Sequence, residues 1–131
     1  MLPRSLAALG VVVAAAVAAP SALAGSVQTF YSPTGNIACE IGVNRPGIGS
    51  YAYCQTFRPA RSVRLSRGGA LHVCSGGGCI GDPAEDAWTL GYGESETLGP
   101  FRCTSLTSGM RCVVRRTGHG FLIRKAGVRR V

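Results

Sequence analysis

The sequence predicts an all-β fold, a small antiparallel sheet, barrel or sandwich that is stapled by disulfides and has at most one short helical turn. Short apolar segments recur at regular spacing between glycine-rich turns, and no long helical period or internal repeat interrupts them. Six cysteines in a chain of 131 residues are typical of a disulfide framework. The length allows one small domain, and a hydrophobic content of 46% excludes a disordered chain.

The first 24 residues have the pattern of a secretory signal peptide. Arg4 supplies positive charge, residues 6–19 are continuously apolar, and Ala22-Leu23-Ala24 presents the small residues that signal peptidase accepts. The apolar run is shorter than the ~20 residues needed to span a bilayer, which disfavours the alternative of an uncleaved anchor. We therefore expect cleavage after Ala24, secretion to an oxidising extracytoplasmic space, and a single β domain over residues 25–131.

The strands of this domain are predicted from alternation and from β-branched or aromatic content. Residues 27–31 and 37–41 flank the turn residues Ser-Pro-Thr-Gly-Asn and form a hairpin. Residues 42–50 are predicted to be a loop. Further strands are expected over residues 51–54, 70–74, 88–92, 100–104, 110–114 and 121–124.

Two segments depart from this pattern. Residues 58–67 carry an arginine every third position, a period that fits neither a strand nor a helix, so a loop is predicted there. Residues 82–85 read Asp-Pro-Ala-Glu, in which Asp82 can cap, Pro83 suits a first helical position and Glu85 can reach back. They are the predicted helical turn.

The six cysteines permit fifteen pairings, and the sequence does not choose among them. Pairing each with its neighbour is attractive: Cys39 with Cys54, Cys74 with Cys79, and Cys103 with Cys112. The last bridge has the best argument, because a four-residue loop over residues 106–109 places Cys103 directly opposite Cys112. The spacing of Cys74 and Cys79 does not fit zinc, and we expect neither a metal nor a cofactor.

Charge is the most informative functional feature. Loss of Arg4 leaves 13 basic and 6 acidic residues, a net charge of +7. Five acidic residues lie within residues 82–96, whereas residues 102–131 hold eight basic and no acidic side chains. An exported basic surface meets anionic polymers first, so we expect a binding module for an anionic envelope component or for another protein, with nucleic acid disfavoured. The candidate binding residues are Arg58, Arg61, Arg64, Arg115, Arg116, Arg124 and Arg130. Their plainer interpretation is solubility.

Two alternatives remain open. A small secreted hydrolase could use His119 as a base with Glu94 or Glu96, but no nucleophile motif accompanies them and their convergence in one pocket is required. A secreted inhibitor or effector could present a rigid loop at residues 75–78 or 106–109 to another protein. A binding role is favoured over an enzyme.

The segment Phe30-Tyr-Ser-Pro-Thr-Gly-Asn-Ile-Ala-Cys39 resembles the opening motif of a family of small exported actinobacterial proteins of unknown function, which reads Phe-x-Ser-Pro-Ser-Gly-Asn-Ile-x-Cys. The likeness continues through Cys54 and residues 90–93, 101–105, 109–112 and 117–121, in order along the chain. The resemblance implies an exported, disulfide-linked all-β domain and supplies no activity, ligand or catalytic residue. In that family the partner of the middle cysteine usually precedes it, so Cys79 is a departure.

Overall fold

The computed structural model describes residues 2–3, 7–16 and 25–131. The proposed cleavage site after Ala24, and residues 1, 4–6 and 17–24 of the expected signal peptide, lie outside the described residues. Residues 7–16 are exposed and have no regular secondary structure. No helix in the described part of the chain is long and apolar enough to cross a membrane.

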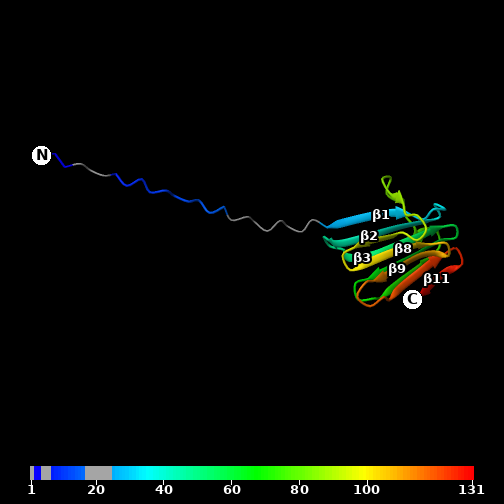
Figure 1. Cartoon of the computed structure of the whole chain (residues 1–131). Helices are drawn as coiled ribbons and strands as arrows, with labels where there is room; N and C mark the ends of the chain where they lie inside the picture. The colour runs from blue at the N-terminus through cyan, green and yellow to red at the C-terminus, as the bar shows by residue number, and fades with distance from the viewer. Residues whose placement is uncertain (1, 4–6, 17–24) are drawn as a thin grey trace.

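The all-β prediction is confirmed, and the domain is a sandwich of two sheets (Figure 1). All neighbouring strands are antiparallel except β1 and β6, which pair in parallel. Sheet A has the order β5 (Leu71–Ser75), β4 (Ala60–Ser66), β3 (Gly49–Phe57), β2 (Ile37–Arg45), β1 (Ser26–Tyr31) and β6 (Trp88–Thr89). Sheet B has the order β11 (Gly127–Arg130), β10 (Gly120–Arg124), β9 (Gly109–Val114), β8 (Phe101–Leu106) and β7 (Ser95–Leu98).

The core lies between the inner faces of the two sheets. Three phenylalanines, Phe30, Phe101 and Phe121, are fully buried there, with aliphatic side chains from both sheets around them. Alternate residues of β8 and β9 are buried or exposed, as a strand with one covered face requires. Burial of these large side chains from both sheets holds the layers together.

The neighbour-to-neighbour disulfide pairing is confirmed for all three bridges. Cys103 lies directly opposite Cys112 in the predicted register, although the connecting turn is tighter than predicted because residues 106 and 109 also pair. Cys39 lies opposite Cys54 in the same way on sheet A. These two bridges point into the core, whereas the bridge between Cys74 and Cys79 lies at the edge of sheet A.

The predicted loop over residues 58–67 is wrong, because β4 occupies most of it. Val63 and Leu65 are fully buried, while Arg64 between them is on the outer face. The three-residue spacing of the arginines concealed this two-residue alternation. The loop predicted over residues 42–50 is also too long, since β2 runs to Arg45 and β3 begins at Gly49.

The predicted helical turn over residues 82–85 is wrong as well. The structure has one 3₁₀ turn, Gly77–Cys79, within the described residues. Residues 76–87, which we call the strap, connect β5 at one edge of sheet A to β6 at the other. Five strand spacings amount to roughly 24 Å, a distance that favours an extended chain over a compact helical one. The strap therefore follows an irregular, extended path.

The side chains of sheet A hold the strap in place. The Gln55 amide donates a hydrogen bond to the Gly81 carbonyl (2.7 Å) and accepts one from the Gly81 N–H (3.0 Å). The Tyr53 hydroxyl donates to the Cys79 carbonyl at 3.3 Å. The strap consequently covers part of the outer face of sheet A and carries the acidic residues Asp82, Glu85 and Asp86 there.

Candidate functional site

The seven candidate arginines are divided among several places. Arg115 and Arg116 follow β9 at one end of the sandwich, whereas Arg58 and Arg124 lie at the other end. Arg64 lies on the outer face of sheet A. The remaining two connect the sheets: Arg61 donates to the Lys125 carbonyl and Arg130 donates to the Gly69 carbonyl, both at 3.3 Å. The structure does not gather all seven into one site.

Four arginines meet at the end of the sandwich where β9 finishes. Turns from both sheets form an open cleft of about 830 Å³ there, which we call the arginine cleft. Its arginines are Arg67, Arg102, Arg115 and Arg116, and its lining includes no carboxylate among the described residues. Uncompensated guanidinium groups around one concave surface give a strongly positive potential, which attracts anions.

Two of these guanidinium groups are oriented by hydrogen bonds. Arg102 Nε donates to Thr97 Oγ1 at 3.2 Å, and Arg115 Nη1 donates to the Gly99 carbonyl at 3.2 Å. Each guanidinium has five N–H donors in a rigid plane, so most of them stay available for a ligand. Partial fixation lowers the entropy lost when an anion binds.

The arginine cleft continues onto the outer face of sheet B. A depression of about 330 Å³ shares Arg102 and Arg115 with it and adds Arg111. The Ser95 and Thr104 hydroxyls, hydrogen-bonded to each other at 2.7 Å, lie on its floor. The basic surface therefore extends from the end of the sandwich along one face.

The sequence analysis did not name Arg67, Arg102 and Arg111, which line the arginine cleft and the depression beside it. A signal for two of them was present, since Arg102 precedes Cys103 and Arg111 precedes Cys112. Once those cysteines face the core, strand alternation places both arginines on the outer face. Arg67 had no such signal, because it comes from a turn of the other sheet.

Charge is segregated in the folded domain. The exposed acidic residues of the strap lie over part of the outer face of sheet A, and the arginine depression lies on the outer face of sheet B. One ion pair, between Arg45 and Glu40, occurs among the described residues. The cleft arginines therefore have no carboxylate partner among the described residues and are available to an external anion.

A second hollow of about 440 Å³ lies at the opposite end of the sandwich. The turns between β1 and β2, between β8 and β9, and between β10 and β11 form it, with Arg58 from the turn between β3 and β4. Tyr92, half exposed at 50%, contributes to its wall. We call this hollow the hydroxyl groove because serine and threonine side chains line it.

Arg64 belongs to a polar cluster on the outer face of sheet A. Its guanidinium carbon lies 4.0 Å from the centre of the Tyr51 ring. The Tyr51 hydroxyl donates to Glu40 Oε1 and accepts from Arg45 Nη1 (2.7 Å). The Tyr51 ring occupies the space beside Gly42, where a Cβ would lie 2.6 Å from it. The cluster thus buries Tyr51, at 4% exposure, and has a structural role.

Burial of the phenol, together with its hydrogen bond to Glu40, raises the pKa of Tyr51. Tyr51 has a higher pKa in the folded state than in the unfolded state, where the pKa is about 10. Its contribution to stability is therefore complete below about pH 10 and is lost as the pH rises through the folded-state pKa. We expect the free energy of unfolding to decline above about pH 10, and to decline less steeply in Tyr51→Phe. Denaturant unfolding at a series of alkaline pH values measures this, and parallel curves for both proteins would contradict it.

The residues of the hydrolase alternative do not converge. Glu94 pairs through its carbonyl with Ser105, at the end of sheet B that holds the turn between β8 and β9. His119 pairs with Val114 at the opposite end of the sheet. Glu96 lies on the edge strand β7, with β8 between it and β9. The Glu94 carboxylate accepts the Gly91 N–H at 2.8 Å, as in an ordinary turn.

The loops of the effector alternative have different surroundings. Residues 76–78 are exposed at the start of the strap, and Gly76 donates to the Ala60 carbonyl. Residues 107 and 108 form the tight turn between β8 and β9 and line the hydroxyl groove. Only the first of these loops is an exposed segment outside both grooves.

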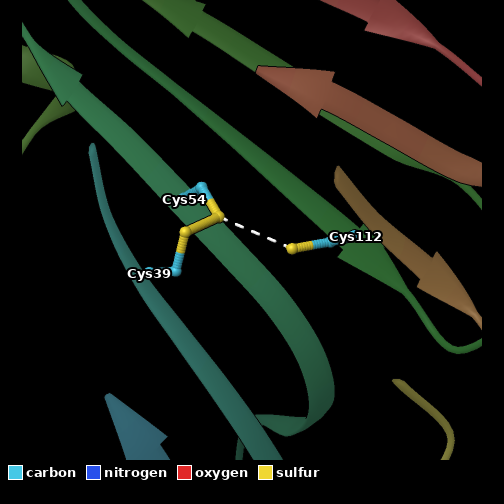
Figure 2. Close-up of side chains that lie close together, drawn as sticks. All are labelled: Cys39, Cys54 and Cys112. Carbon is cyan, nitrogen blue, oxygen red and sulfur yellow. Dashed lines mark hydrogen bonds between the residues drawn. A yellow bond between two sulfur atoms is a disulfide. The ribbon is translucent and has the colours of Figure 1, made fainter. Parts of the chain in front are cut away.

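Three sulfur atoms lie close together in the core, as Figure 2 shows. The Sγ atoms of Cys39, Cys54 and Cys112 are within 4.8 Å of one another, and Cys54 Sγ contacts Cys112 Sγ at 3.6 Å. Metals bind cysteine as a thiolate, whereas each of these sulfurs is part of a disulfide and has no proton to lose. In the oxidised protein the contact is therefore van der Waals packing between a bridge of sheet A and a bridge of sheet B.

The fold and the site together define a disulfide-linked β-sandwich with an arginine-lined cleft at one end. The chain matches no protein-family profile, no curated protein and no solved structure.

Proposed function

We propose that this protein is an exported binding module that recognises an anionic component of the cell envelope through the arginine cleft. The observation that carries the proposal is the convergence of four arginines from both sheets around one concave surface. Arginine suits this role because its planar fork makes paired hydrogen bonds to phosphate or carboxylate oxygens. Three disulfides in a small domain suit an oxidising, extracytoplasmic compartment.

The signal-peptide pattern supports export, and the resemblance to small exported actinobacterial proteins agrees with it. The separation of Glu94 and Glu96 from His119 disfavours the hydrolase alternative. Binding therefore remains the function with the most structural support.

Binding of the oxidised protein to isolated cell envelope across a salt series tests the proposal. We expect binding to persist at ~0.15 M salt, where attraction between separated surface charges is largely screened. We expect Arg115→Gln/Arg116→Gln to weaken it by about tenfold or more, because charge-assisted hydrogen bonds are lost.

The matched control is Arg64→Gln/Arg129→Gln, which removes the same charge outside the cleft. Because Arg64 packs on Tyr51, thermal unfolding is used to show that this variant is folded at the temperature of the binding assay. It is expected to reduce binding by no more than about twofold at the same salt concentration. Equal losses in the two double variants would show that net charge alone causes binding. Complete loss of wild-type binding at that salt concentration would also contradict the proposal.

A further inference from the structure

The hydroxyl groove has a different chemistry from the arginine cleft. Three cationic side chains, Arg58, Arg124 and Lys125, line it and are exposed. Between them the lining includes an exposed aromatic ring, Tyr92, and apolar atoms of Leu106. The arginine cleft lacks an aromatic side chain in its lining as the structure describes it.

The turn between β1 and β2 builds one wall of the groove and positions one of its cations. The Asn36 amide donates to the Arg58 carbonyl (3.1 Å) and accepts from the Arg58 N–H (3.0 Å). The Ser32 hydroxyl holds the same turn by accepting from the Ile37 N–H at 3.1 Å. The polar side chains of the Ser-Pro-Thr-Gly-Asn motif thus fix the backbone of Arg58 at the groove.

The turn between β8 and β9 adds hydroxyl groups to the lining of the groove. The Thr107 and Ser108 hydroxyls are exposed in the turn between β8 and β9, and neither has a hydrogen-bond partner among the described side chains. The turn between β10 and β11 is held by Arg61, which donates to the Lys125 carbonyl. Its cations therefore project from an anchored backbone.

We infer that the hydroxyl groove is a second binding site, for an acidic oligosaccharide, and that it acts independently of the arginine cleft. A pyranose ring has an apolar C–H face that packs on an aromatic ring, here Tyr92, and a hydroxyl edge that pairs with short polar side chains. Carboxylate groups on the sugar pair with Arg58, Arg124 and Lys125. The groove, at about 440 Å³, is large enough for a short oligosaccharide.

Titration of the oxidised protein with trigalacturonate, and with neutral galactotriose as the comparison, tests this inference. Calorimetry is expected to show binding of the acidic trimer that is at least tenfold tighter than binding of the neutral one. Tyr92→Ala is expected to weaken binding of the acidic trimer about tenfold. Arg124→Gln is expected to reduce the preference for the acidic trimer severalfold.

The matched control is Arg129→Gln, which removes the same charge from an exposed residue that lines neither the hydroxyl groove nor the arginine cleft, and it is expected to leave trigalacturonate binding unchanged. Tyr92 and Arg124 are exposed, so thermal unfolding of both variants is expected to match the wild type. The inference is overturned if trigalacturonate does not bind at millimolar concentration, if galactotriose binds equally well, or if Arg129→Gln weakens binding as much as Arg124→Gln. These results leave the envelope-binding test of the arginine cleft unaffected.

Discussion

Gly120→Ala is expected to destabilise the protein by about 3 kcal/mol or more. Gly120 begins β10 and pairs with Val113, where a Cβ would lie 1.9 Å from the Cys112 carbonyl oxygen. Backbone atoms cannot rotate away as a flexible side chain does, so β10 would separate from β9 or shift its register. Denaturant unfolding of the oxidised protein measures the loss as a lower transition midpoint.

The control for this substitution is Gly77→Ala on the exposed strap. A Cβ at Gly77 meets nothing within 4 Å, and its expected effect is within about 0.5 kcal/mol. Equal stability of Gly120→Ala and Gly77→Ala would show that β9 and β10 are not packed as described. The comparison separates a packing effect from the general effect of adding a methyl group.

Removal of a core disulfide has the second large expected effect. Cys103→Ala/Cys112→Ala is expected to lower the free energy of unfolding by about 2–5 kcal/mol. Both cysteines are fully buried, and Cys112 contacts the Cys39–Cys54 bridge across the core. The substitution therefore adds a cavity between the sheets to the loss of the cross-link.

Cys74→Ala/Cys79→Ala is the matched control, because it removes a bridge at the sheet edge. Chain-entropy estimates for the two loops are similar, at roughly 3 kcal/mol for the core bridge and roughly 2 kcal/mol for the edge bridge. A distinctly larger loss in the core variant consequently measures packing rather than loop closure. Equal losses would contradict the packing of the two core bridges against each other.

The placement of both grooves follows from the architecture of the sandwich. Strands point their alternate side chains into the core or out to solvent, and turns gather at the two ends of the layers. The arginine cleft and the hydroxyl groove each combine turns from both sheets, so neither exists in a single hairpin. Their geometry depends on how the two sheets stack, and the contact between the two core disulfides is part of that packing.

Local patterns along the chain predicted much of this fold. Alternation identified the strands around Cys103 and Cys112, and the register that places these cysteines opposite each other followed from the length of the connecting turn. The turn residues Ser-Pro-Thr-Gly-Asn identified the hairpin between β1 and β2. Such features depend on residues close in sequence, which is why they are readable without the tertiary structure.

Other elements were hidden because long-range partners decide them. Arg61 and Arg64 lie in a strand because β3 and β5 pair with it on both sides. Asp82 and Pro83 have the pattern of a helix start but form no helical turn, because they belong to the strap, which crosses sheet A from one edge to the other. Residues 127–130, for which the sequence predicted no strand, form β11 because the edge of β10 is open to pairing.

By itself the sequence determined the all-β class, the separation of acidic from basic segments, and the hairpin register that places Cys103 opposite Cys112. Only the tertiary structure decided which arginines share a surface. Arg67 comes from a turn of sheet A and Arg115 from a turn of sheet B, and they line one cleft because the two sheets stack face to face. Charge is a property of composition, whereas convergence of charge depends on the packing of segments far apart in the chain.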